Sequence, residues 1–128
     1  MKNVKKIYKS NMTFIETVYF CYGQKAYKNI TEKINNNEFK QIEKDGITDL
    51  WKNNNGSYTI VIAVRKIKNV IQLKGLIVHE ITHATDFIMR QNDFTDMEFR
   101  AYCNQAMYQS AMEWIDNKLA SNRSIRED

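Results

Sequence analysis

The two histidines of the chain, His79 and His83, stand four residues apart, and Glu80 directly follows the first of them. On an α-helix, residues four apart lie on the same face, so both imidazoles can bind one metal ion. Glu80 would lie about 100° further round the helix, where it can reach a metal-bound water without binding the metal. This H-E-x-x-H spacing therefore predicts a catalytic zinc site.

The alternative is a pair of histidines buried in a helical core. The surrounding sequence argues against it, because residues 70–90 combine an apolar face with a polar stripe that a core helix does not need. The apolar face holds Val70, Leu73, Ile77, Ile81, Ala84 and Ile88, and the stripe holds Gln72, His79, His83, Asp86 and Arg90.

Two other features of this predicted helix bear on its geometry. Asn69 precedes it and has the spacing of a capping pair with Gln72. Gly75 lies one turn before His79, and a glycine there costs a helix about 1 kcal/mol relative to alanine. Gly75 marks either a close approach by a ligand or another backbone, or an uncompensated weak position.

A catalytic zinc site generally has three protein ligands and one water. Since the chain has no third histidine, an acidic residue or a cysteine must supply the remaining ligand. Glu98 is the favoured candidate, because the fourteen residues between His83 and Glu98 allow one helix to end and a second to return across it. Ala101, on the same face as Glu98, would let the two helices pack closely.

Alternative roles for these acidic residues are open. Thr95 and Glu98 also have the spacing of a capping box, in which Glu98 folds back onto its own helix. Asp93 and Asp96 are then the alternative ligands. Asp86 shares the histidine stripe, but it lies a further turn along and has a short side chain, so we expect it at most to orient a ligand.

The remaining sequence predicts an α+β fold. Strands are expected at residues 12–21, 39–43, 47–52 and 57–65, a short amphipathic helix at 24–35, and a last helix at 95–119. The segment 57–65 is apolar on both faces, which predicts cover on both sides. Asp45-Gly46 predicts a hairpin turn, and residues 1–10 a flexible or edge segment.

These elements fit a single domain over residues 1–119 with a flexible tail at 120–128. The expected architecture is a small mixed or antiparallel sheet of about four strands with one N-terminal helix, followed by the H-E-x-x-H helix and a long C-terminal helix.

Composition limits the other classes of function. The net charge of +4 is a mild excess, and Lys2, Lys5, Lys6 and Lys9 predict a solvated basic N-terminal arm, with nucleic acid or an acidic protein as the alternative partner. We expect a cytoplasmic protein with no membrane contact, because no apolar run approaches the ~18 residues of a membrane span and the N-terminus lacks a signal-peptide pattern. Cys21 and Cys103 are expected to be free thiols.

His79-Glu80-Ile81-Thr82-His83, followed by Glu98-Phe99-Arg100-Ala101-Tyr102, resembles the gluzincin metallopeptidases. The chain is most similar to small single-domain zincin-like proteins of phages and mobile elements, which carry H-E-x-x-H and then E-x-x-A. The resemblance implies a minimal zincin fold, a Zn²⁺ cofactor with Glu98 as third ligand, a protein or peptide substrate and a location in the bacterial host cytoplasm.

The motif predicts peptide hydrolysis by metal-activated water, with Glu80 as general base. Tyr102 and Tyr58 are candidate donors to the oxyanion. The strand at 57–65 could bind an extended peptide if it lies at the sheet edge. The alternative function is a non-catalytic protein on the same scaffold that binds and blocks a host factor.

Overall fold

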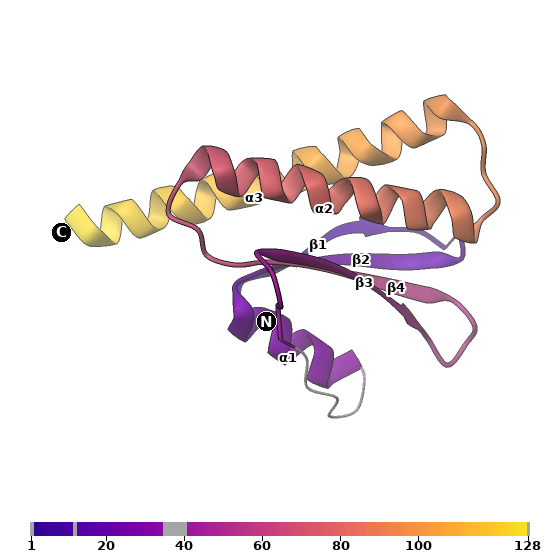
Figure 1. Cartoon of the computed structure of the whole chain (residues 1–128), viewed down its shortest axis with the longest axis horizontal. Coiled ribbons are helices and arrows are strands. Elements are labelled where there is room, and N and C mark those ends of the chain that lie inside the picture. The colour runs from indigo at the N-terminus through magenta and orange to yellow at the C-terminus, as the bar shows by residue number, and fades with distance from the viewer. Residues whose placement is uncertain (1, 12, 35–40, 128) are drawn as a thin grey trace.

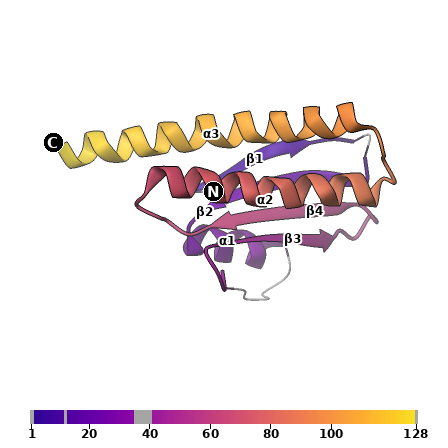
Figure 2. The ribbon, with the colours of Figure 1, turned by 45° about the horizontal axis from the view of Figure 1, so that its top comes forward.

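The computed structural model describes residues 2–11, 13–34 and 41–127, with the backbone alone for residues 122–127. Two helices cover one face of a four-stranded sheet and a third helix covers the other face (Figures 1 and 2), which confirms the α+β class and the mixed sheet of four strands. The elements in chain order are β1 (Val4–Lys9), β2 (Ile15–Tyr22), α1 (Gln24–Ile34), β3 (Gly46–Lys52), β4 (Tyr58–Val64), α2 (Val70–Gln91) and α3 (Met97–Glu127).

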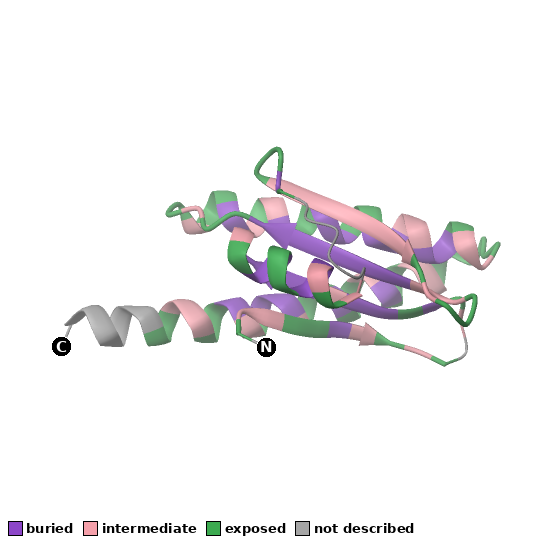
Figure 3. Ribbon diagram, turned by 90° about the horizontal axis from the view of Figure 1, so that it is seen from below, coloured by how far each residue is buried: buried purple, intermediate pink, exposed green. Residues whose placement is uncertain are grey.

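The strand order is β1-β2-β4-β3, so β4 is central and β3 is an edge strand. The pair β2 and β4 is parallel, whereas β1 with β2 and β3 with β4 are antiparallel. Alternate residues of β4 enter two cores: Ile60 and Ile62 pack towards α2 and α3, while Val61 and Ala63 pack towards α1. The prediction of cover on both sides is confirmed, and Figure 3 shows how much more buried the central strands are than β3.

One strand and its hairpin were predicted wrongly. Phe39 and Lys40 lie outside the described residues, and residues 41–43 form no strand. Gly46 is therefore not in a hairpin turn but begins β3, whose antiparallel partner is β4 across residues 53–57. The fourth strand is instead β1, whose lysines suit an edge position because charged side chains oppose further strand pairing.

Helix α2 follows its sequence pattern. The Asn69 side chain caps it by accepting a hydrogen bond from the Gln72 amide at 3.0 Å. The predicted apolar face is buried from Leu73 to Ile88, and the polar stripe faces outward. The helix thus presents both histidines to solvent while the sheet holds its other side.

Helix α3 begins close to the expected position and runs to Glu127, beyond the expected end at Leu119. It packs on α2 and over β1 through an apolar face made by Cys103, Met107, Ala111 and Ile115. Cys103 and Cys21 are both free and buried, as expected. Of the helices described, none has the length and apolar character needed to cross a bilayer.

Candidate metal centre

His79 and His83 lie side by side on the exposed face of α2. Their Nε2 atoms are 3.2 Å apart, and their rings meet edge to face with centroids 4.8 Å apart. Two nitrogens that each lie about 2.05 Å from a tetrahedral zinc ion are themselves about 3.3 Å apart. The pair therefore fits two of the four ligand positions. Because both side chains are exposed, the alternative of a histidine pair buried in the core is excluded.

Glu80 lies on a different side of the helix from the two imidazoles. Its side chain is only 5% exposed and turns towards the edge strand β3. The Thr48 hydroxyl lies 2.8 Å from Glu80 Oε1 and 3.1 Å from the Glu80 carbonyl oxygen, and it donates its hydrogen to this pair of acceptors. A β3 side chain thus fixes the position of the Glu80 carboxylate.

Gly46 provides the space that this carboxylate occupies. A Cβ at position 46 would lie 3.0 Å from Glu80 Oε2 and 3.1 Å from Leu76 Cδ1, which is tighter than most Cβ contacts, so these side chains would have to move. Sequence reasoning missed both Gly46 and Thr48 as site residues. No local signal connects Thr48 to Glu80, since they are 32 residues apart and meet only because β3 lies beside α2.

On the α3 side, Glu98 is exposed in the first turn. The cap of this helix is Asp96, not Thr95, because the Asp96 carboxylate accepts hydrogen bonds from the amides of Glu98 and Phe99 at 2.9 and 3.1 Å. Arg100 faces α2, and Glu98, two residues earlier, lies about 200° away round the helix. Among the described residues, Glu98 does not join the two histidines in a group of three placed to hold one metal ion.

The other candidates occupy separate places. Asp86 forms an ion pair with Arg100 of α3 and so joins the two helices. Tyr102 is 67% exposed, and Tyr58 begins β4, where its amide donates to the Phe14 carbonyl. Asp93 lies in the α2–α3 connection with a positive φ of 52°.

Across the described part of the chain, no group of three or more His, Cys, Asp or Glu side chains is placed to hold one metal ion. The arrangement brings together two imidazoles, with a hydrogen-bonded carboxylate on the neighbouring side of the same helix. Comparisons of the chain with known protein families, curated proteins and solved structures give no match.

Proposed function

We propose that this protein is a zinc-dependent hydrolase of peptide bonds, with a minimal zincin arrangement. The observation that carries the proposal is the 3.2 Å separation of His79 Nε2 and His83 Nε2 on an exposed helix face, with Glu80 adjacent in sequence. The two imidazoles are spaced as ligands of one tetrahedral ion. Packing does not account for this arrangement, because an exposed pair buries little apolar surface.

Each residue of the centre has a distinct role in this proposal. His79 and His83 would hold the metal, which when bound would lower the pKa of a water molecule and polarise a carbonyl group. Glu80 accepts a proton from the attacking water and delivers it to the leaving amine. Thr48 is a positioning residue, since its hydroxyl holds one oxygen of Glu80 at 2.8 Å.

The substrate role first considered for the strand at 57–65 passes to β3. Strand β4 is central, whereas β3 has an open edge and lies against α2. An extended peptide could pair with this edge by strand addition. It would then lie on the side of α2 to which Glu80 points, because Thr48 of β3 contacts that carboxylate.

The third ligand is the part of the proposal that depends most on the resemblance. Glu98 stays our proposed ligand because it matches the E-x-x-A motif. Since the described structure does not group it with His79 and His83, metal binding would require its side chain to move towards them. Asp93, in the connection before α3, is the alternative. Asp96 is less suitable, since its carboxylate already caps α3.

Zinc content and cleavage, measured on the same preparations, test the proposal. Zinc is quantified by mass spectrometry in the wild type and in four variants, and each is incubated with unfolded protein substrates and bacterial lysate. We expect zinc to be lost in His79→Ala, reduced in Glu98→Ala and retained in Glu80→Gln, with cleavage abolished in all three. Gln72→Ala, on the same polar stripe, is the matched control and should behave as the wild type. Zinc-free wild-type protein would refute the proposal, and full zinc in Glu98→Ala would refute that ligand.

A non-catalytic role on the same scaffold is the second candidate. The placement of Glu80 favours it, because the carboxylate is buried and already accepts a hydrogen bond from Thr48. A protein that blocks a host factor would keep its biological activity in Glu80→Gln, whereas a peptidase would lose it. The same variant therefore distinguishes the two functions.

A further inference from the structure

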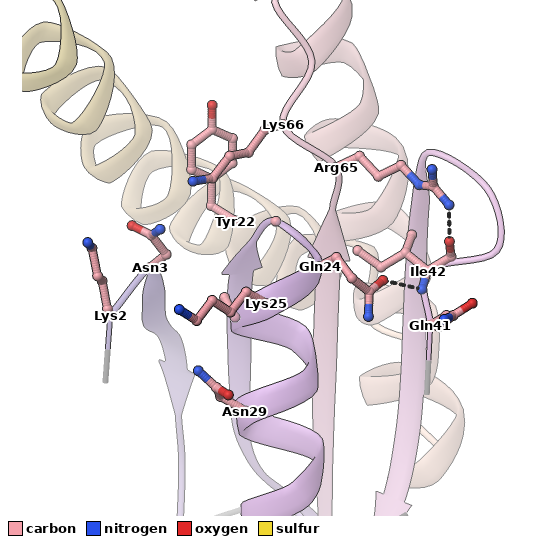
Figure 4. Close-up of a pocket in the computed structure, with 12 residues that line it drawn as sticks. Lys2, Asn3, Tyr22, Gln24, Lys25, Asn29, Gln41, Ile42, Arg65 and Lys66 are labelled. Atoms are coloured by element: carbon pink, nitrogen blue, oxygen red, sulfur yellow. Dashed lines mark hydrogen bonds between the residues drawn. The ribbon is translucent and has the colours of Figure 1, made fainter. Parts of the chain in front are cut away.

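A pocket of about 640 Å³ lies where β2 and β4 end and α1 begins (Figure 4). Because β2 and β4 are parallel, their carboxyl ends meet at one edge of the sheet, which is where open α/β sheets commonly bind ligands. The volume is within the range of small-molecule sites. Most of the lining residues come from the first turns of α1, from the end of β2 and from the segment after β4, and the lining includes neither His79 nor His83.

The charge in this pocket has one sign. Among the described residues that line it, the charged side chains are all cations: Lys2, Lys25, Arg65 and Lys66. In Figure 4 the amines of Lys2 and Lys25 lie on one side of the first turn of α1, and the Arg65 guanidinium lies on the other. Four cations around one hollow raise the local positive potential and attract an anion.

These cations are not neutralised by carboxylates within the described chain. The ion pairs found there, Lys74 with Asp116 and Arg100 with Asp86, lie elsewhere. Arg65 uses one terminal nitrogen on the Ile42 carbonyl, which leaves its other N–H donors for a ligand.

Gly23 shapes the pocket through its backbone and its lack of a side chain. Its φ of +102° favours glycine, and a Cβ there would lie 3.1 Å from Lys66 Cε. The Lys66 side chain can therefore cross Gly23 and place its amine 5.4 Å from the centre of the Tyr22 ring. The cation is thus held at the end of β2.

The first turn of α1 adds backbone donors. Amides at the start of a helix have no partner within the helix, and Gly23, whose carbonyl accepts the Tyr27 amide, has no side chain to cap them. The turn also carries no acidic residue, so the positive end of the helix dipole is not offset there. Amides at Lys25 and Ala26, both lining the pocket, are suited to phosphate oxygens.

We propose that this pocket binds a phosphorylated small molecule of about nucleotide size. Cations and helix-terminal amides together match the charge and the acceptor oxygens of a phosphate group. The volume exceeds what a phosphate alone would fill, so we expect a diphosphate or nucleotide to bind more tightly than inorganic phosphate. This site does not depend on the metal centre.

Calorimetric titration with inorganic phosphate, pyrophosphate and ADP tests the proposal. We expect ADP or pyrophosphate to bind the wild type, with the affinity reduced about tenfold or more in Arg65→Gln and in Lys66→Gln, since each removes charged donors. Lys68→Gln is the matched control, because this exposed lysine follows Lys66 by two residues but does not line the pocket. It should change the affinity less than twofold.

Amide NMR spectra locate the binding independently. ADP should shift the Lys25 and Ala26 signals, and it should still bind His79→Ala, which separates this site from the metal centre. The proposal is overturned if none of the three probes binds at millimolar concentration, or if Lys68→Gln weakens binding as much as Lys66→Gln. Binding of a single-stranded oligonucleotide without binding of ADP or pyrophosphate would also overturn it.

Discussion

At the scale of single residues, Gly46 contributes to the site by leaving space for the Glu80 side chain. A methyl group there would press on Glu80 and Leu76, and such overpacking typically costs about 1–3 kcal/mol. We expect Gly46→Ala to lower the free energy of unfolding by that amount in urea titrations. It should also reduce cleavage while zinc is retained, because the carboxylate is displaced but the imidazoles are not. Unchanged stability and activity would show that the site has room for the methyl group.

Thr48 offers a second test at this scale. Thr48→Val removes the donor to a buried carboxylate oxygen, and loss of such a partner costs about 1–3 kcal/mol. Urea unfolding should show this loss. Thr82→Val is the control because the exposed Thr82 hydroxyl donates to the Val78 carbonyl of its own helix and, among the described residues, to no carboxylate. Equal effects of the two substitutions would mean that Thr48 does not hold Glu80.

The residues of the centre differ in how well the sequence could predict them. The closeness of His79 and His83 follows from the helical repeat alone, so their spacing in the sequence was sufficient to predict it. The burial of Glu80 against Thr48 depends on which strand lies beside α2, and the position of Glu98 depends on how α3 is rotated. Neither of these is encoded in local spacing, because both result from packing between distant elements.

At the scale of elements, Gly75 is a weak position in α2. Beyond the adjacent residues and the backbone of α2 itself, no described atom lies within 4 Å of the Cβ that an alanine would add there. The helix should therefore become more stable without a steric clash. We expect Gly75→Ala to raise the free energy of unfolding by about 0.5–1 kcal/mol, measured by urea or thermal unfolding. A stabilised variant with unchanged cleavage would identify Gly75 as an uncompensated weak spot. Loss of cleavage in a stabilised variant would instead show that a substrate approaches this turn.

The elements that the sequence predicted correctly carry strong local patterns. Helix α2 has its N-cap Asn69 and a continuous apolar face, and β4 has apolar residues on both faces. Strand β1 was harder to predict because its lysines mask the alternation of a strand. The Asp45-Gly46 pair was misleading, since its turn preference was overridden by the pairing of β3 with β4.

At the scale of the whole molecule, the two candidate sites share no residue. The histidines lie on the exposed face of α2, and the basic pocket lies at the ends of β2 and β4, beside the start of α1. The Tyr22-Gly23-Gln24 strand-to-helix junction and the Arg65-Lys66 pair were both visible in the sequence. The sequence did not predict that these two segments lie together, because their proximity requires the parallel pairing of β2 with β4 across a long connection.

The core between α1 and the sheet also predicts how stability depends on pH. Burial raises the pKa of the Cys21 thiol to about 12, whereas a thiol in an unfolded chain ionises near about pH 8.5. Between these values only the unfolded chain loses the proton, so the free energy of unfolding should fall as pH rises, by about 1.4 kcal/mol per pH unit for this group. Burial, together with the hydrogen bond to Asp49, raises the pKa of Tyr27 as well. The free energy of unfolding should therefore fall more steeply above about pH 10.

Urea unfolding under reducing conditions at a series of pH values measures this slope. Cys21→Ala should make the fall from about pH 9 to about pH 11 shallower by close to one proton. Val61→Ala, a truncation in the same core cluster, is the control, because it should lower stability equally at every pH and leave the slope unchanged. An unaltered slope in Cys21→Ala would mean that the thiol ionises equally easily in the folded protein, which its position between α1 and the sheet argues against.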